Sequence, residues 1–130
     1  MTNLEVVRLY LEAIEQGRTG DELAAFFMPG AQQIEYPNRL VTRGATRDLA
    51  EILEGAERGK HVVSSQSFAI KTAVESGNTV ALEVFWSAKL KVAIESLAVC
   101  DFIQAHIAMF IELRDGKIIA QRNYDCYTPS

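Results

Sequence analysis

A histidine and an aspartate near the C-terminus are the residues of this chain best suited to acid–base chemistry. Asp115-Gly116 stands between two apolar runs, and such a pair predicts a two-residue type I′ hairpin turn because both turn positions need a positive φ. Counting outward from that turn places His106 opposite Asp125, with Cβ atoms roughly 5 Å apart. A carboxylate beside an imidazole fixes the ring tautomer and raises its basicity, so the pair could take up or deliver a proton.

The two faces of this predicted hairpin differ in polarity. One face carries His106, Asp125, Gln104 and Asn123, and the other face of the first strand is apolar throughout: Ile103, Ala105, Ile107, Met109, Ile111 and Leu113. By alternation alone the polar face could equally line a cavity or meet solvent, with the apolar face as the core. A type I turn with a glycine bulge would shift the register by one residue and separate Asp125 from His106.

The bulk properties describe one ordinary globular domain spanning residues 1–130. Hydrophobic residues make up 48% and charged residues 23%, and the net charge is −4, which argues against a nucleic-acid or anionic-membrane surface. No apolar run reaches the ~18 residues of a membrane span. The start of the chain lacks the features of a signal peptide, so we expect a cytoplasmic protein.

Metal and disulfide chemistry are not indicated by the sequence. Cys100 and Cys126 are too few for a disulfide framework, and no His or Cys spacing is typical of a zinc site. No glycine-rich phosphate loop is present. We therefore expect no metal and no cofactor, and we assign no role to His61 or to the cysteines.

Three helices are predicted in the first half of the chain. Residues 3–16 have helical apolar spacing after a capping box of Thr2 and Glu5. A second box, Thr19 with Glu22, predicts a short helix that stops at Pro29-Gly30, and residues 45–58 predict the third helix. A short strand is expected at 33–36.

The second half changes to a period of two. Four long strands are predicted over 61–75, 79–94, 101–114 and 117–127. Helices followed by an antiparallel meander indicate an α+β domain with its helices packed on one face of the sheet.

Two motifs carry a family resemblance. The chain has FIELRDGKII at 110–119 followed by QRNYD at 121–125, and IEYPN at 34–38 followed by Arg43-Gly44 before a helix. With the order of elements, these resemble the SnoaL-like, ketosteroid-isomerase-like branch of the nuclear-transport-factor-two-like superfamily. The resemblance implies a cone-shaped barrel of a strongly curved antiparallel sheet, with three N-terminal helices on its concave side. It further implies a small-molecule pocket on the concave face and a homodimer through the convex face, where the apolar 103–113 surface would lie.

Carried onto this sequence, the resemblance implies a pocket with catalytic Asp125, His106 and Tyr10. The implied substrate-binding residues are Asn123, Tyr36, Trp86, Gln104, Phe27, Leu82, Val84 and Ala108. SnoaL-type cyclases use an aspartate base near the end of the last strand, which Asp125 matches, and His106 with Asn123 resembles the pocket groups of dehydratases. The ketosteroid isomerase carboxylates align with Tyr36 and Ala108, so the same steroid isomerisation is not expected. The Asp-Arg-Asp network of the epoxide hydrolases of this fold has no match, because Arg122 would face away from Asp125.

The sequence thus favours a cofactor-independent acid–base enzyme of the cyclase, isomerase or dehydratase type. It would act on a hydrophobic, oxygenated small molecule, with Asp125 as the base, His106 as its partner, and Tyr10, Tyr36 and Asn123 binding oxygen. Two alternatives remain: a non-catalytic ligand-binding or dimerising module, and an interaction protein of the nuclear-transport type with a vestigial pocket.

Overall fold

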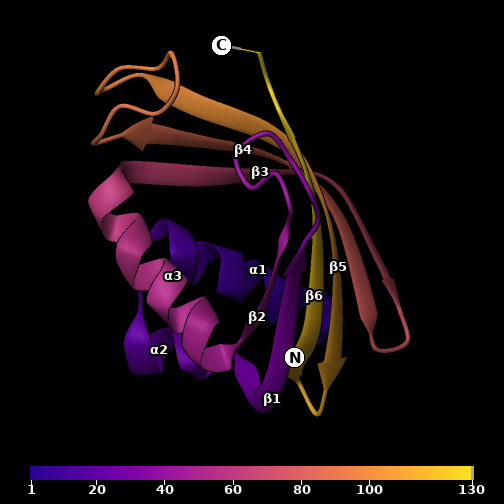
Figure 1. The fold of residues 1–130 in the computed structure, drawn as a ribbon. Coiled ribbons are helices and arrows are strands. Elements are labelled where there is room, and N and C mark those ends of the chain that lie inside the picture. The colour runs from indigo at the N-terminus through magenta and orange to yellow at the C-terminus, as the bar shows by residue number, and fades with distance from the viewer. Residues whose placement is uncertain (130) are drawn as a thin grey trace.

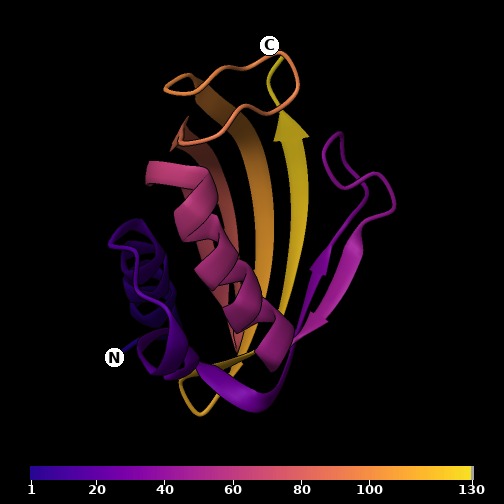
Figure 2. The same ribbon diagram turned by 60° about the vertical axis from the view of Figure 1, so that its left-hand side comes forward.

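The protein folds as one strongly bent sheet with three helices on its concave side (Figure 1). A computed structural model describes residues 1–129. The elements are α1 (Asn3–Glu15), α2 (Gly20–Ala24), β1 (Phe27–Glu35), β2 (Ala45–Asp48), α3 (Leu49–Val62), β3 (Val63–Ser76), β4 (Thr79–Leu90), β5 (Phe102–Arg114) and β6 (Lys117–Tyr127). Helix α3 lies across the concave face, between α1 and α2 on one side and the β1–β2 pair on the other (Figure 2). The α+β class and the curved sheet predicted from the sequence are confirmed.

The sheet has six strands in the order β2-β1-β6-β5-β4-β3 and stays open. The predicted meander from β3 to β6 is antiparallel. The pairing of β1 with β6 is parallel, so the sheet is mixed and not wholly antiparallel.

The helix starts follow their capping chemistry. The Thr2 hydroxyl accepts a hydrogen bond from the Glu5 backbone N–H, and Glu5 accepts one from the Thr2 N–H, so the predicted box begins α1. No such side-chain bond forms at Thr19 before α2. Helix α3 begins after a box of Asp48 and Glu51, four residues later than predicted. The preceding residues form β2 instead, because they pair with β1.

The β5–β6 hairpin contains the decisive departure from the predicted register. Its turn is as predicted, with positive φ at Asp115 and Gly116, and Leu113 pairs with Ile118. Glu112 then pairs with Ala120, which leaves one extra residue in β6 as a bulge. Beyond it Asp125 pairs with Ile107, and His106 pairs with Cys126. The predicted pairing of His106 with Asp125 is therefore wrong.

The apolar face of β5 forms the core under the helices. All six of its residues are buried: Ile103, Ala105, Ile107, Met109, Ile111 and Leu113. They pack with buried residues of β4, α1 and α3, including Val84, Val7 and Ile52. The prediction that this face lies on the convex side is wrong, because only the concave side has helices to cover it. Within residues 1–129, no helix is long and apolar enough to cross a bilayer.

Loss of the Asp48 cap should destabilise the helix that covers the concave face. Asp48→Ala should lower the free energy of unfolding by about 1 kcal/mol, because the N–H of Glu51 loses its acceptor. Urea denaturation followed by circular dichroism measures the change. The control is Thr19→Ala at the start of α2, where no side-chain cap exists, and its effect should stay below about 0.5 kcal/mol. Equal losses in the two variants would contradict the assigned cap.

Candidate functional site

A cavity in two chambers lies between the helices and the concave face of the sheet. The outer chamber has a volume of about 760 Å³ and is lined mainly by α1, α3, β1 and the start of β3. The inner chamber, of about 200 Å³, reaches β4, β5 and β6. Both are lined by Tyr10, Ile14, Gln33, Gln66, Trp86 and Tyr127, so the two chambers adjoin each other.

Asp125 lies on the wall of the inner chamber. Its Oδ1 is buried and has no hydrogen-bond partner within residues 1–129. Burial raises the pKa of Asp125 to about 6, helped by the negative charge of Glu35 and opposed by the positive charge of Arg47. This carboxyl group can therefore exchange a proton near neutral pH, which is what a general acid or base requires.

A chain of neutral donors runs beside Asp125. The Tyr10 hydroxyl donates to Gln121 Oε1 at 2.9 Å, and Gln121 Nε2 donates to Asn123 Oδ1 at 3.1 Å. Burial raises the pKa of Tyr10, so its phenol stays protonated. The side-chain oxygen of Asn123 accepts from Gln121, and no hydrogen bond of its amide nitrogen is found in the described part of the chain. That nitrogen is available to a ligand oxygen.

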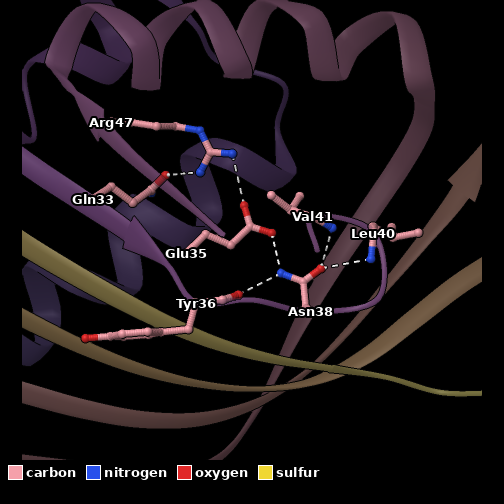
Figure 3. A network of polar contacts seen from close by, with 7 residues as sticks. All are labelled: Gln33, Glu35, Tyr36, Asn38, Leu40, Val41 and Arg47. Carbon is pink, nitrogen blue, oxygen red and sulfur yellow. Dashed lines mark hydrogen bonds and ion pairs between the residues drawn. The ribbon is translucent and has the colours of Figure 1, made fainter. Parts of the chain in front are cut away.

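A second carboxylate of the cavity, Glu35, is fully engaged (Figure 3). Its Oε1 accepts from Arg47 Nη2 at 3.0 Å, and its Oε2 accepts from Asn38 Nδ2 at 2.8 Å. Asn38 is held in turn, because its Oδ1 accepts from the backbone N–H groups of Leu40 and Val41. The two carboxylates thus have opposite environments: Glu35 is paired with a cation, whereas Asp125 has a buried oxygen without a donor. Among residues 1–129, no three His, Cys, Asp or Glu side chains gather as metal ligands would.

Gly44 explains how the loop after β1 can close over Glu35. Its φ is +69°, and a Cβ at this position would lie 2.6 Å from the backbone oxygen of Glu35. Any other residue would therefore clash as well as strain the backbone. The Arg43-Gly44 motif of the sequence thus has a local structural cause.

The structure brings together four of the predicted site residues, Tyr10, Trp86, Asn123 and Asp125, on the cavity wall. Trp86 is fixed there by a hydrogen bond from its Nε1 to Gln66 Oε1 at 3.0 Å. Three more predicted residues lie on the concave side but are buried in the core, outside the cavity lining: Phe27, Leu82 and Val84.

Four predicted pocket residues lie on the convex face instead. His106 is exposed and packs against Phe85, with ring centroids 5.0 Å apart. Gln104 and Ala108 alternate onto the same side of β5, opposite the buried apolar residues. Tyr36 stacks on Tyr124 at 4.5 Å between ring centroids. The pocket positions predicted for His106, Gln104, Ala108 and Tyr36 are therefore wrong, because β5 and the end of β1 turn their other faces inward.

Six residues that line the cavity were not among the predicted site residues: Gln33, Glu35, Arg47, Gln66, Gln121 and Tyr127. Gln121 and Tyr127 lie an even number of residues from Asp125 along β6, so the strand period of two places all three side chains on one face. Gln33 and Glu35 share one face of β1, and the next residue, Tyr36, faces outward. Arg47 had no such signal, because it lies on β2, a strand that the helical pattern of 45–58 concealed.

The architecture is similar to that of several solved structures. IdmH, a proposed polyketide cyclase from Streptomyces antibioticus, has a TM-score of 0.78 and 15% identity over 96% of this chain and 92% of its own. A proposed SnoaL-like polyketide cyclase from Jannaschia sp. CCS1 has a TM-score of 0.73 and 13% identity over 95% and 84%. A protein from Catenulispora acidiphila with a ketosteroid isomerase-like fold, solved with trimethylamine, has a TM-score of 0.71 and 19% identity over 95% and 86%.

The chain thus shares its fold with proteins described as SnoaL-like, ketosteroid isomerase-like and NTF2-like. The family resemblance read from its motifs is thereby confirmed for the fold. No protein-family model matches the sequence, and no curated protein sequence matches it. The function of the chain is therefore inferred from the geometry of its cavity.

The raised pKa of Asp125 predicts how stability depends on pH. The pKa lies at 3.8 in an ordinary environment and at about 6 in the folded protein, so the folded state binds more protons between these values. The contribution of Asp125 to folding is fully present below pH 3.8 and is lost as the pH rises to about 6. At pH 7.5 the free energy of unfolding of Asp125→Asn, measured by urea denaturation, should therefore exceed that of the native protein by on the order of 1–3 kcal/mol. The difference in free energy should narrow at pH 4.

The matched control is Asp21→Asn, on the exposed surface of α2. It should leave the shape of the pH profile as in the native protein. If Asp125→Asn is no more stable than the native protein at pH 7.5, the carboxylate is not destabilised as described.

Proposed function

We propose that the protein is a cofactor-independent acid–base enzyme in which Asp125 removes a proton from a carbon beside a carbonyl group. One observation carries the proposal: a carboxyl group on the wall of the inner chamber has a buried oxygen without any protein donor and a pKa of about 6. A structural carboxylate would be paired or hydrogen-bonded. An unpaired one beside a cavity is placed to accept a proton from a ligand.

The transfer balances within the site. The carbon–hydrogen bond breaks, an O–H bond forms on Asp125, and the electron pair moves into an enolate whose oxygen becomes negative. The amide nitrogen of Asn123 is a neutral donor for that oxygen, and Tyr10 acts indirectly by fixing the amide chain. Reprotonation at the same or another carbon by Asp125 would give an isomerase or cyclase type of reaction.

The walls of the inner chamber define the ligand class. They are mainly apolar, with Ile14, Phe68, Trp86, Ile107 and Met109 among them. Apolar walls with a few converging polar groups suit a hydrophobic ring system carrying oxygen. Another protein of this fold, TerC, was co-crystallised with polyporic acid; it has a TM-score of 0.72 and 13% identity over 95% of this chain and 90% of its own.

Hydrogen exchange on a simple ketone tests the proton transfer. The protein should catalyse deuterium incorporation at C2 of 1-tetralone in D₂O, measured by mass spectrometry. Asp125→Asn should lower this rate by about 10²–10⁴-fold, because the base is lost. The native rate should rise between pH 5 and 7 as Asp125 ionises, since its pKa is about 6.

The control for this experiment is His106→Gln on the convex face, which should leave the rate unchanged. Binding of 1-tetralone without exchange, or exchange unaffected by Asp125→Asn, would instead favour a ligand-binding module or a different base.

We further propose that the convex face joins a second copy of the chain. The apolar 103–113 residues that first suggested this interface are buried, but other large side chains take their place. Phe102, Phe110 and Tyr124 are 54%, 37% and 43% exposed. Tyr124 links Tyr36 and Phe110 into one aromatic cluster, with centroid distances of 4.5 Å and 6.0 Å. A two-fold axis through the cluster would bury it against itself.

A charge placed in this cluster should separate the copies. Phe110→Glu should convert a dimer into a monomer in light scattering coupled to size exclusion, because the carboxylate would be desolvated at the interface. Val99→Glu changes an equally apolar exposed residue in the 91–101 connection and should leave the dimer intact. A native protein that is monomeric at all accessible concentrations would rule out this interface.

A further inference from the structure

Tyr127 is the tyrosine of the cavity whose hydroxyl is not engaged. The chain has four tyrosines; Tyr10 donates to Gln121, and Tyr36 and Tyr124 stack on each other outside the cavity. Tyr127 lines both chambers. Within residues 1–129 its hydroxyl has no hydrogen-bond partner, and Asp125 Oδ1 is the only sealed side-chain polar atom without one. The hydroxyl of Tyr127 is therefore neither engaged nor sealed, on a residue that lines the cavity.

The ring of Tyr127 is held firmly. Its backbone pairs with Ala105 at the end of β6, and the next residue, Thr128, donates its N–H to the carbonyl of Gln104 at 2.9 Å. The edge of Trp86 meets the ring at a centroid distance of 6.4 Å, and the Arg39 guanidinium lies 5.6 Å from the ring centroid.

Arg39 is itself fixed from two sides. Its Nε lies 3.1 Å from Glu95 Oε1, and its Nη1 donates to the carbonyl of Thr128 at 3.0 Å. The ring of Tyr127 is thus in contact with the edge of Trp86 and with a hydrogen-bonded cation before any ligand arrives. Such preorganisation is what an effective transition-state donor needs.

Tyr127 and Asp125 face the same space. They are two residues apart on β6, so their side chains share a face with Cα atoms roughly 7 Å apart. A ligand spanning this gap would meet a base at one end and a phenol at the other. Burial raises the pKa of Tyr127, with the charges of Asp125 and Glu35 adding to this and Arg39 opposing it. The group therefore remains a protonated donor at the pH where Asp125 is ionised.

We propose that Tyr127 is a further catalytic residue: its hydroxyl donates a hydrogen bond to the ligand oxygen that becomes negative when Asp125 takes the proton. No proton leaves the tyrosine; its hydrogen bond shortens as charge moves from the carbon–hydrogen bond onto the oxygen. This inference rests on the proposed function, since the acceptor of the Tyr127 hydrogen bond is the oxygen of the enolate that forms when Asp125 removes the proton. Tyr10 cannot take this part without giving up its bond to Gln121.

The experiment uses Tyr127→Phe, which removes a single oxygen, and 1-tetralone labelled with ¹³C at its carbonyl. Bound to the native protein, the carbonyl resonance should lie downfield of its value in an aprotic solvent, and it should move back upfield in Tyr127→Phe. The exchange kcat at C2 should fall by about 10²–10³-fold, while KM changes less, because the bond strengthens with the developing charge. Tyr36→Phe, on the convex face, is the matched control and should change neither readout.

Failure of this inference is distinguishable from failure of the proposed function. If Asp125→Asn abolishes exchange while Tyr127→Phe leaves resonance and kcat unchanged, the base stands and the donor role is overturned. If Tyr127→Phe moves the resonance while Asp125→Asn still exchanges, the donor stands as a binding group and the base proposal fails. Absence of 1-tetralone binding at its solubility limit overturns the donor role too, since a donor for such oxygens must engage a simple ketone. An unchanged urea midpoint for Tyr127→Phe shows that any fall in its exchange kcat comes from the lost hydroxyl and not from unfolding.

Discussion

A single extra residue in β6 decides which side chains meet the cavity. Ile118 and Ala120 pair with Leu113 and Glu112, so Ile119 has no partner of its own on β5. The parallel neighbour β1 also loses register here, because Phe27 pairs with Ile118 and Gln32 with Ala120. Strand period is two, so the shift turns the later polar residues of β6 from the convex to the concave face. Without it Asp125 would stand beside His106 in solvent, and the cavity would have no carboxyl group on β6.

Local chemistry explains what the sequence could predict. The Thr2–Glu5 box, the Asp115-Gly116 turn and the period-two strands all depend on neighbours within a few residues. The box and the turn were correctly placed, and the four strands were located to within a few residues at their ends. The bulge depends on how β6 fits two neighbouring strands at once, and no glycine or proline marks it in β6. β2 escaped for a similar reason, since its residues read as helix and become strand only by pairing with β1. The outward direction of His106, by contrast, agrees with the alternation of β5 once its apolar face is taken as the core, which is the alternative that the sequence left open.

The cavity departs from the rule that buried polar groups are satisfied, and it does so at one atom. Tyr10 donates to Gln121, Gln121 donates to Asn123, and Glu35 uses both oxygens. Among the fully buried side-chain polar atoms of the described residues, only Asp125 Oδ1 has no partner. Leaving a buried acceptor unsatisfied costs about 1–3 kcal/mol, which the surrounding apolar packing of β4, β5 and α1 must offset. Such exceptions in an otherwise consistent fold are expected where function and stability conflict.

The position of Arg47 explains how Asp125 keeps a useful basicity. A cation in direct contact would hold an aspartate ionised with a low pKa, and such a carboxylate is a weak acceptor for the proton of a carbon acid. Arg47 does lower the pKa of Asp125, but Glu35 binds this guanidinium at 3.0 Å and raises the same pKa by its own charge. The charges of Glu35 and Arg47 therefore act on the pKa of Asp125 in opposite directions, and burial is the largest cause of its shift. Asn38 completes the arrangement. Its amide nitrogen donates to the second oxygen of Glu35, and its amide oxygen accepts from backbone N–H groups of the loop. The electrostatics of the inner chamber are thus set on β1 and β2, while the groups that meet the ligand stand on β6.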